Sequence, residues 1–358
     1  KAGSSEHHHQ GHEHMDHDEM AFMSMVEVTK DLPRSPDGLP MDWIEVPFGP
    51  VFPGLPGGLL LNLTLDGDTV TKVQAESLVG GANLMSVSGM AATRFVEQLE
   101  TMDPLAPVAY RLLACRGLEE ASGDRPNEPV LRGRVAALEH ERITSHLGWL
   151  EQLGRQTGLA WLEHHATRLQ RVCLQTDFSQ ISHLPSTLRA FTKRLMQTPL
   201  LRARLAGIGT VTADSNLRGP VARAAGLASD ARSGDVTYQA LSFRRMQRPD
   251  GDAFDRLRIR LDEILHSIEL IQSAGVLKAP GPFAVGTASG EGQASIETPR
   301  GEARLHLVLD NGLVSHAHLD TPSNHHVSLL PGLLVQQELG DALTTVCSLD
   351  LSPWEFAT

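Results

Sequence analysis

The sequence is poor in the residues that several large classes of protein require. Its 358 residues include three cysteines, Cys115, Cys173 and Cys347, which lie far apart and form no C-x-x-C pair. This spacing excludes a disulfide framework and a cysteine metal site of the usual kind, and it favours a reducing, cytoplasmic setting. Aromatic residues make up 4% of the chain and the formal net charge is −12. Both values argue against a nucleic-acid-binding surface, which needs a basic stripe and stacking side chains.

The chain also lacks a long hydrophobic run. Its longest apolar stretches, such as residues 57–61 and 327–335, fall far short of the ~20 residues that a membrane-spanning helix needs. The hydrophobic fraction of 41% is typical of a soluble globular protein. We therefore expect any membrane association to go through a partner.

The N-terminal residues have the composition of a tail. We expect residues 1–40 to be a flexible His/Met-rich tail without a secretory signal, and residues 41–358 to form one large domain. Lys1 in place of an initiator Met suggests that something upstream is missing. Imidazoles in the tail could chelate Zn, Ni or Cu, although a solvated low-complexity tail or part of an expression tag is the simpler interpretation. The histidines concerned are His7, His8, His9, His12, His14 and His17.

Strand patterns follow the tail. Residues 43–46, 59–65 and 70–75 read as strands, and Asp66-Gly67-Asp68 predicts a tight hairpin turn between the last two. Residues 47–58 are rich in Pro and Gly and cannot be regular structure. We expect a stiff loop that lines a cavity or docks on a partner, with Val51, Phe52 and Leu55 as its apolar side chains.

Helical periodicity dominates the middle of the chain, and strands return near its end. Residues 91–123 are helical with a break near Asp103-Pro104. Further helices are predicted at residues 134–155, 161–174, 185–205, 252–272 and 327–339, and further strands at residues 294–298, 303–309 and 314–319. The fold class is α+β, with a central four-helix bundle flanked by small N-terminal and C-terminal β-structures.

The helix predicted at residues 134–155 carries an unusual line of charge. Glu139, Arg142 and His146 project from the middle of its apolar side, whereas Arg134 and Glu141 are placed on the polar side. Burying ionised groups costs several kcal/mol each unless they are paired. The line is therefore either a structural polar network to a neighbouring helix or part of a site.

Several stretches, in this order, resemble the large catalytic subunit shared by NADH-quinone oxidoreductase (the D subunit of complex I) and the membrane-bound energy-converting [NiFe] hydrogenases. The match spans roughly residues 44–352. Its residues are Gly49-Pro50, Leu63-Thr64-Leu65-Asp66-Gly67, Glu139, Arg142, His146-Leu147, Gly207-Ile208-Gly209, residues 252–260, Pro299-Arg300-Gly301-Glu302 and Ser348-Leu349-Asp350. The family fold is a helical bundle flanked by β-structures, which agrees with the pattern above.

The sequence departs from the family at both known active sites. The resemblance places the two C-x-x-C pairs of the hydrogenases near residues 101–104 and at Ser352 and Glu355, where no cysteine stands, so we expect no nickel. The His, Tyr and Asp that bind quinone in the reductases correspond to Pro56, Pro104 and Gln156. A proline offers no titratable group, so that proton-transfer role is lost as well.

The resemblance implies a large peripheral-arm subunit without known catalytic residues. We expect it on the cytoplasmic side of the bacterial inner membrane, coupling an iron-sulfur small subunit to a proton- or ion-translocating membrane arm. Expected partners are that small subunit with its [4Fe-4S] cluster, a membrane subunit beside residues 47–58 and a protein similar to the C subunit of complex I. No cofactor is expected on the chain itself.

Two other hypotheses stay open. In the first, the chain is a redox enzyme subunit that reduces a quinone or another substrate in the same cavity, with Glu139, Arg142, His146 or the pair His325-His326 as catalytic candidates. In the second, it binds metal through the His-rich tail.

Overall fold

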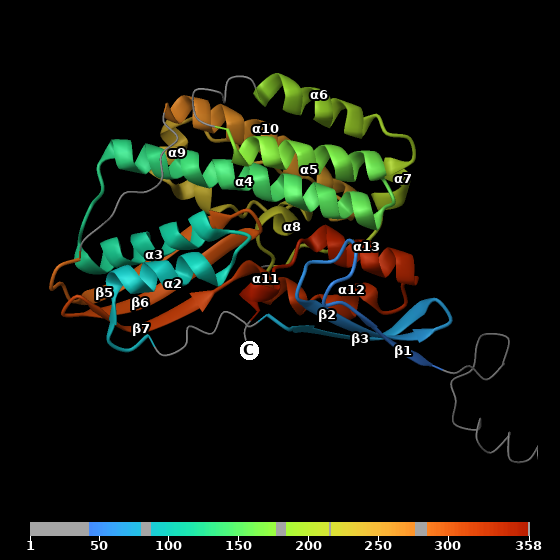
Figure 1. Ribbon diagram of the computed structural model, residues 1–358, viewed down its shortest axis with the longest axis horizontal. Coiled ribbons are helices and arrows are strands. Elements are labelled where there is room, and N and C mark those ends of the chain that lie inside the picture. The colour runs from blue at the N-terminus through green and yellow to red at the C-terminus, as the bar shows by residue number, and fades with distance from the viewer. Residues whose placement is uncertain (1–42, 80–86, 177–183, 215, 276–284, 357–358) are drawn as a thin grey trace, which may run out of the picture.

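The computed structural model describes residues 43–79, 87–176, 184–214, 216–275 and 285–356. The predicted tail lies outside this part of the chain. In Figure 1 the helical bundle lies above two β-structures, one formed near each end of the sequence. The predicted α+β architecture is confirmed.

The first β-structure is an antiparallel sheet of three strands in the order β1-β2-β3. Leu59, Leu61 and Leu63 of the central strand are buried. The hairpin turns at Gly67, whose φ of 64° suits glycine. The predicted strands and turn are confirmed, with bounds β1 (Ile44–Phe48), β2 (Leu59–Asp66) and β3 (Thr69–Ser77).

The bundle differs in one member from the predicted one, because the helical region of residues 91–123 packs on the C-terminal sheet and the helix predicted at residues 252–272 takes its place. Its members are α4 (Glu128–Gln156), α5 (Ala160–Leu174), α6 (Leu184–Met196) and α10 (Ala253–Ala274). The prediction of one helix over residues 185–205 is wrong, because α6 ends at Met196 and a short α7 (Leu201–Leu205) follows. Pro199 interrupts the run, and Leu200 has a left-handed φ of 61°.

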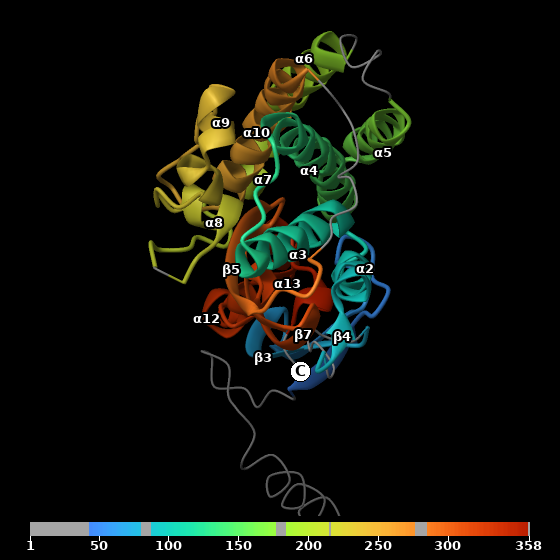
Figure 2. The ribbon, with the colours of Figure 1, turned by 90° about the vertical axis from the view of Figure 1, so that its left-hand side faces the viewer.

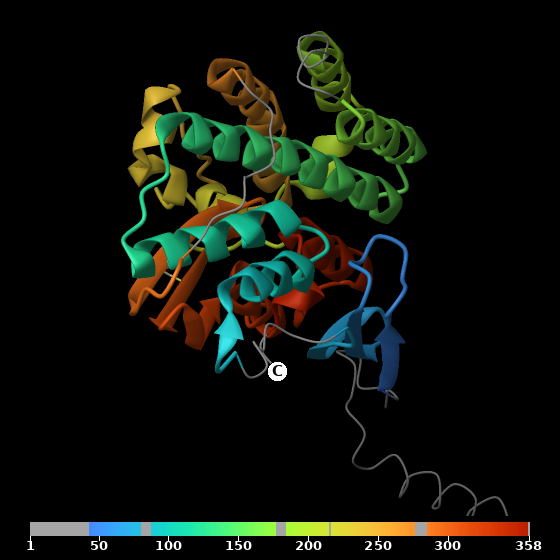
Figure 3. The same ribbon diagram turned by 60° about the vertical axis from the view of Figure 1, so that its left-hand side comes forward.

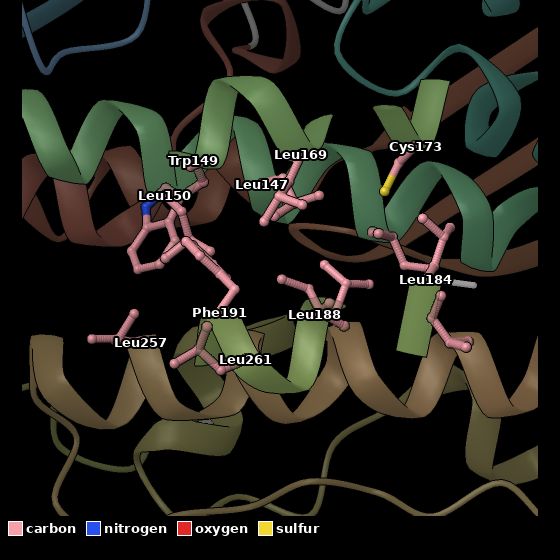
Figure 4. Packing of buried hydrophobic residues seen from close by; sticks show 14 of the residues in the cluster. Leu147, Trp149, Leu150, Leu169, Cys173, Leu184, Leu188, Phe191, Leu257 and Leu261 are labelled. Atoms are coloured by element: carbon pink, nitrogen blue, oxygen red, sulfur yellow. The ribbon is translucent and has the colours of Figure 1, made fainter. Parts of the chain in front are cut away.

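Apolar side chains of α4, α5, α6 and α10 interlock at the centre of the bundle. Figure 4 shows Leu147 and Leu150 of α4 facing Leu188 and Phe191 of α6, with Leu261 of α10 beside them. Leu147, Leu150 and Leu188 are fully buried. Burial of each such side chain stabilises the fold by roughly 1.5–3 kcal/mol.

Helix α4 is buried on more sides than its periodicity indicated. Arg134, Glu141 and Thr144 were placed on a polar face, but all three are buried. The reason is packing on both sides, since α4 contacts α5 and α10 within the bundle and also α3 and α13 below it. A helix surrounded in this way needs polar partners, and Arg134 finds one in the carboxylate of Glu119.

The second β-structure is a four-stranded sheet in the order β4-β7-β6-β5, covered by two helices. Figures 2 and 3 show α2 and α3 lying along the sheet, below α4. The approach of α3 to β5 requires glycine at Gly292, because a Cβ there would lie 2.0 Å from the carbonyl oxygen of Gly117. The predicted strands and the helix break near Asp103 are confirmed. The bounds are β4 (Met90–Ala91), α2 (Ala92–Met102), α3 (Pro107–Ser122), β5 (Gly290–Thr298), β6 (Gly301–Asp310) and β7 (Leu313–Asp320).

Short helices connect the bundle with the sheets. The prediction of a single helix over residues 327–339 is wrong, because Gln336 has a φ of 68° and Glu338 is extended. The chain instead forms several short helices around the N-terminal sheet and beside α10. They are α8 (Gly219–Ala224), η2 (Ala231–Gly234), α9 (Val236–Ala240), α11 (Pro322–Val327), α12 (Leu330–Leu334), α13 (Leu339–Leu349) and η3 (Pro353–Glu355).

The loop predicted at residues 47–58 is only partly as expected, because Pro47 and Phe48 lie in β1. Val51 is 90% exposed, but Leu55 is 5% exposed and belongs to the core around the N-terminal sheet. The loop is held to the bundle at Gly54, where an added Cβ would lie 2.7 Å from the side-chain oxygen of Gln156. Its apolar exposure is therefore confined to the tip near Val51.

Candidate functional site

The predicted line of Glu139, Arg142 and His146 is completely buried, and each of its members has partners. Arg142 Nε donates to both carboxylate oxygens of Glu139, at 3.1 and 3.2 Å. The other nitrogens of Arg142 donate to the carbonyl oxygens of Glu297 and Thr298 in β5. Arg142 therefore ties the centre of α4 to the end of the C-terminal sheet.

Glu139 has further donors from elements far along the chain. Tyr238 and Ser267 donate their hydroxyls to its two oxygens, at 2.7 and 2.5 Å, and Arg232 lies 3.5 Å away. Burial alone would raise the pKa of Glu139, but the guanidinium groups of Arg142 and Arg232 outweigh it and hold the pKa below its usual value. This carboxylate is ionised and saturated.

His146 belongs to the same buried network through α10. Its Nε2 lies 2.9 Å from Glu263, and its Nδ1 lies 3.2 Å from a nitrogen of Arg260. Because Arg260 can only donate, Nδ1 accepts, so the ring is neutral and donates to Glu263 through Nε2. Burial lowers the pKa of His146 to about 4, which keeps the ring neutral at pH 7.

Glu263 is the centre of this network. Arg223 and Arg232 donate to its other oxygen at 2.8 and 2.6 Å. Burial raises the pKa of Glu263, but these two cations outweigh it and hold the pKa well below its usual value. We call the charged set around Glu139 and Glu263 the bundle network. It joins α4, α8, η2 and α10, and its members are Glu139, Arg142, His146, Arg223, Asp230, Arg232, Glu263 and Glu297.

The pair His325-His326 does not join the bundle network. His326 is buried in α11 and its Nε2 accepts the backbone N–H of Arg218 at 3.2 Å. Burial lowers the pKa of His326 to about 3. His325 lies 2.6 Å from Asp320 and is partly exposed. The pair therefore anchors α11 to neighbouring segments.

The two segments that correspond to the metal-binding pairs do meet in space, but they bring oxygen atoms together. Asp103, between α2 and α3, is fully buried, as are Ser352 and Glu355 at the C-terminal end. Tyr110 of α3 donates to Glu355 at 2.7 Å, and the N–H of Ser323 donates to its other oxygen. Burial and the nearby carboxylate of Asp103 raise the pKa of Glu355 to about 7.

The cysteines lie elsewhere, in separate parts of the core. Cys115, Cys173 and Cys347 are all buried and free. Nickel in thiolate sites requires soft sulfur ligands, which carboxylate and hydroxyl oxygens do not replace. The donor set at Asp103, Ser352 and Glu355 thus does not fit the metal centre of the hydrogenases.

A cavity of about 420 Å³ lies beside this cluster, between the start of α3 and helices α4 and α5. Pro104 and Leu174 form an exposed apolar mouth, while Arg300 and Asp350 line the cavity from buried positions. A cavity with an apolar entrance and charged groups inside suits an amphipathic ligand. The lining residues are Pro104, Leu105, Pro107, Val108, His140, Glu141, Thr144, Ser145, Gly148, Trp149, Glu151, Gln152, Gln170, Leu174, Arg300 and Asp350.

Arg300 is the cation inside this cavity, and its side chain is incompletely paired. Its Nη2 lies 3.4 Å from Asp350 and its Nη1 lies 3.9 Å from Asp103. Arg300 is buried, with 5% of its surface exposed, yet its Nε and Nη1 find no hydrogen-bond acceptor among the described residues. An unsatisfied buried donor costs about 1–3 kcal/mol, so a further acceptor beside the guanidinium of Arg300 would stabilise it.

Glu141 is the lining residue that the sequence analysis missed as a candidate. Its oxygens accept the N–H groups of Val108 and Ala109 at 2.6 and 3.0 Å, in the first turn of α3. Burial raises the pKa of Glu141 to about 8 against these two hydrogen bonds, and Asp103 adds to the rise. Periodicity placed Glu141 on a solvent face, so only the packing of α3 on α4 reveals its position.

The three positions that the resemblance assigns to quinone-binding residues lie near the same cavity. Pro104 lines its mouth, and Gln156 lies one turn beyond the lining residue Gln152 on α4. Pro56 is buried in the loop whose Gly54 abuts Gln156. None of the catalytic candidates Glu139, Arg142, His146, His325 and His326 lines the cavity.

Metal ligands are not grouped in the part of the chain that the structure describes, where no set of three His, Cys, Asp or Glu side chains could hold an ion. The six tail histidines, His7 to His17, lie outside those residues. Metal binding by the tail therefore stays a prediction. No helix within the described ranges is long and apolar enough to cross a membrane.

Comparison with known proteins agrees with this architecture. Residues 169–289 match the family described as the 49 kDa subunit of the respiratory-chain NADH dehydrogenase. The D subunit of the NADH-quinone oxidoreductase of Saccharopolyspora erythraea is 25% identical, over 86% of this chain and 87% of that protein. The chain is similar to the D subunits of the NADH-quinone oxidoreductases. The similarity extends to chloroplasts, where the H subunit of the NAD(P)H-quinone oxidoreductase of Trifolium subterraneum is 24% identical over 87% of this chain and 96% of its own length.

A solved structure shares the fold of this chain. It is a chain of the membrane-bound sulfane sulfur reductase, an archaeal respiratory membrane complex, with a TM-score of 0.78 and 22% identity. The match covers 88% of this chain and 98% of the other. The chain therefore has the fold of that subunit of the sulfane sulfur reductase.

Proposed function

We propose that this chain is the large peripheral-arm subunit of a membrane-anchored assembly related to complex I and the energy-converting hydrogenases. In this role it couples an iron-sulfur small subunit to a proton- or ion-translocating membrane arm on the cytoplasmic side of the inner membrane. The observation that carries the proposal is the cavity beside Asp103 and Glu355, which the family fold positions in a chain whose relatives are subunits of such complexes.

The proposed assembly works without [NiFe] chemistry on this chain. Asp103, Ser352 and Glu355 present oxygens where thiolates would be required, and the three cysteines are buried elsewhere. Electrons would reside on the [4Fe-4S] cluster of the small subunit. The role of this chain would be to bind, orient and change charge in response to those electrons.

The tip of the loop of residues 50–58 is the proposed contact with the small subunit and the membrane subunit, and a protein similar to the C subunit of complex I would complete the arm. Val51 is 90% exposed at this tip, while Leu55 and Gly54 fix the loop to the domain. A loop that is already held in one shape loses little entropy on docking. An apolar side chain in that position favours a protein partner over water.

Affinity isolation from membranes of the native host tests this proposal. We expect the tagged chain to sediment with membranes and to co-purify with a small subunit that shows the spectrum of a [4Fe-4S] cluster. Val51→Asp should reduce recovery of the partners at least tenfold, whereas Val236→Asp, a change at a valine on α9 that is 78% exposed, should not. Recovery of the unaltered chain as a soluble monomer without such partners would refute the proposal.

A second candidate function is the reduction of a quinone or similar compound within the cavity. The favouring observation is the gradient of polarity from Pro104 and Leu174 at the mouth to Arg300 and Asp350 inside. A quinone has an apolar tail and a headgroup that only accepts hydrogen bonds, which suits the free donors of Arg300. Quinone-dependent oxidation of the reduced small subunit in the isolated assembly would demonstrate it.

A further inference from the structure

Glu141 is placed to exchange a proton with whatever occupies the cavity. It is 7% exposed, lines the cavity, and is held by two N–H groups at the start of α3. Each carboxyl oxygen has a second lone pair beyond the one that accepts a backbone N–H. The side chain is therefore fixed in position and still has capacity for a ligand.

Other ionisable residues around the cavity are less suited to this role. His140 on α4 is tied to the carbonyl oxygen of Cys173 at 2.8 Å. Glu151 pairs with Arg155 on the surface of α4. Asp350 lies between Arg300 and Arg260, at 3.4 and 3.0 Å. Glu141 has no cation within ion-pairing distance among the described residues, although Arg142 on its own helix and Asp103 beside α3 both influence its charge.

We propose that Glu141 is the proton-exchanging residue of the cavity, and that Arg300 binds an oxygen of a quinone headgroup there. This inference rests on the second candidate function. A quinone carries an oxygen at each end of its ring, so one can accept from Arg300 while the other faces Glu141. The bound oxidised quinone then receives a hydrogen bond from the protonated carboxyl group.

The chemistry balances with the small subunit as reductant. Reduction of a quinone to a quinol takes two electrons, which the iron-sulfur cluster supplies one at a time, and two protons. The O–H bond of Glu141 breaks as an O–H bond forms on the facing oxygen, and the second proton enters from water at the mouth. Because burial raises the pKa of Glu141 to about 8, the carboxyl can both give this proton at neutral pH and regain it.

Quinone binding to the full chain tests the assignment without any electron transfer. Decylubiquinone quenches tryptophan fluorescence, and Trp149 lines the cavity, so Trp149→Phe should remove most of the specific quench. The affinity of the unaltered chain should fall about tenfold between pH 6.5 and 9.5, because loss of one hydrogen bond corresponds to about this factor. Glu141→Gln should bind with an affinity that no longer changes over this range.

A control and a second measurement protect this test from folding effects. Glu163→Gln on α5 removes a carboxylate that pairs with Arg155 outside the cavity, and it should keep the pH dependence of the unaltered chain. Calorimetry of the unaltered chain in two buffers of different ionisation enthalpy should show uptake of about half a proton per quinone at pH 8 and none at pH 6. This second measurement needs no variant.

The outcomes separate the inference from the function on which it rests. If quinone binds but Glu141→Gln keeps the pH dependence, or if no proton is taken up at pH 8, the assignment of Glu141 is refuted while the quinone function stands. If decylubiquinone does not bind the unaltered chain at all, both are refuted. Binding with a pH dependence that only Glu141→Gln abolishes supports both.

Discussion

Two charged regions lie inside this molecule, and they differ in how completely their polar atoms are paired. In the bundle network, both carboxylate oxygens of Glu139 and of Glu263 accept hydrogen bonds, and Arg223 Nε is the member atom without a partner among the described residues. Beside the cavity, Arg300 Nε and Nη1 and one oxygen of Asp103 lack hydrogen-bond partners among the described residues. Paired carboxylates between packed elements fix a fold, whereas incompletely paired charges next to a cavity would be stabilised further by a polar ligand.

This difference bears on the two interpretations of the charged line on α4. Glu139, Arg142 and His146 were equally compatible with a structural network and with a site. Their saturation, and their absence from the cavity lining, favour the structural interpretation. Their catalytic role stays a prediction, and the first experiment addresses it through stability.

The largest loss of stability is expected from breaking the bundle network. Arg142→Ala removes the cation that pairs with Glu139 and frees two carbonyl oxygens in β5, so the free energy of unfolding should fall by about 3–5 kcal/mol. Urea denaturation measures it. Arg132→Ala on the same helix, where the pair with Glu128 is exposed, should cost no more than about 0.5 kcal/mol. Equal losses in the two variants would contradict a structural role for the network.

The cavity region should lose stability as the pH rises. The pKa of Glu141 is raised from 4.5 to about 8 on folding, so the folded chain binds more protons than the unfolded chain between these values. The free energy of unfolding therefore decreases from pH 5 to pH 8 through this group. In Glu141→Gln this decrease should be smaller by more than about 1.4 kcal/mol, the equivalent of one pKa unit. Identical pH profiles would mean that Glu141 is ionised throughout.

In the bundle network, the stability should change with pH in the opposite direction. The pKa of His146 is lowered from 6.5 to about 4, so the unfolded chain binds more protons between these values and stability falls as the pH decreases through them. His146→Gln should reduce this acid-side loss by more than about 1 kcal/mol. His325→Asn, at a partly exposed histidine of α11, serves as the control. An unchanged acid profile in His146→Gln would contradict a neutral, buried ring.

The sequence predicted the architecture because its long elements carry strong local signals. The apolar stripe of α10, the Asp252 cap before it and the turn at Gly67 each decide their structure within a few residues. The prediction of the short helices near the C-terminus failed because local signals do not decide their structure. Their breaks at Gln336 and Glu338 depend on the pairing of this segment with the N-terminal sheet, as the hydrogen bond from Gln336 to Val70 shows.

The sequence predicted only the part of the candidate site that the periodicity of a single helix reveals. Periodicity identified Glu139, Arg142 and His146 as buried, but their partners Arg232 and Glu263 come from segments about 90 to 120 residues away. Glu141 was assigned to solvent because nothing in the sequence shows that α3 begins against it. Burial of both sides of α4 is a tertiary property, and the cavity between α3, α4 and α5 arises with it.

The difference between the two charged regions can be tested most directly at Arg300. Because Asp350 keeps Arg260 as a partner and the contact of Arg300 with Asp103 is long, at 3.9 Å, Arg300→Met should lower the free energy of unfolding by less than Arg142→Ala does. Decylubiquinone at a hundred times its dissociation constant should stabilise the unaltered chain by about 2.7 kcal/mol but should not stabilise this variant. A loss as large as that of Arg142→Ala, or quinone stabilisation that survives in Arg300→Met, would contradict a ligand-binding role for the cavity charges.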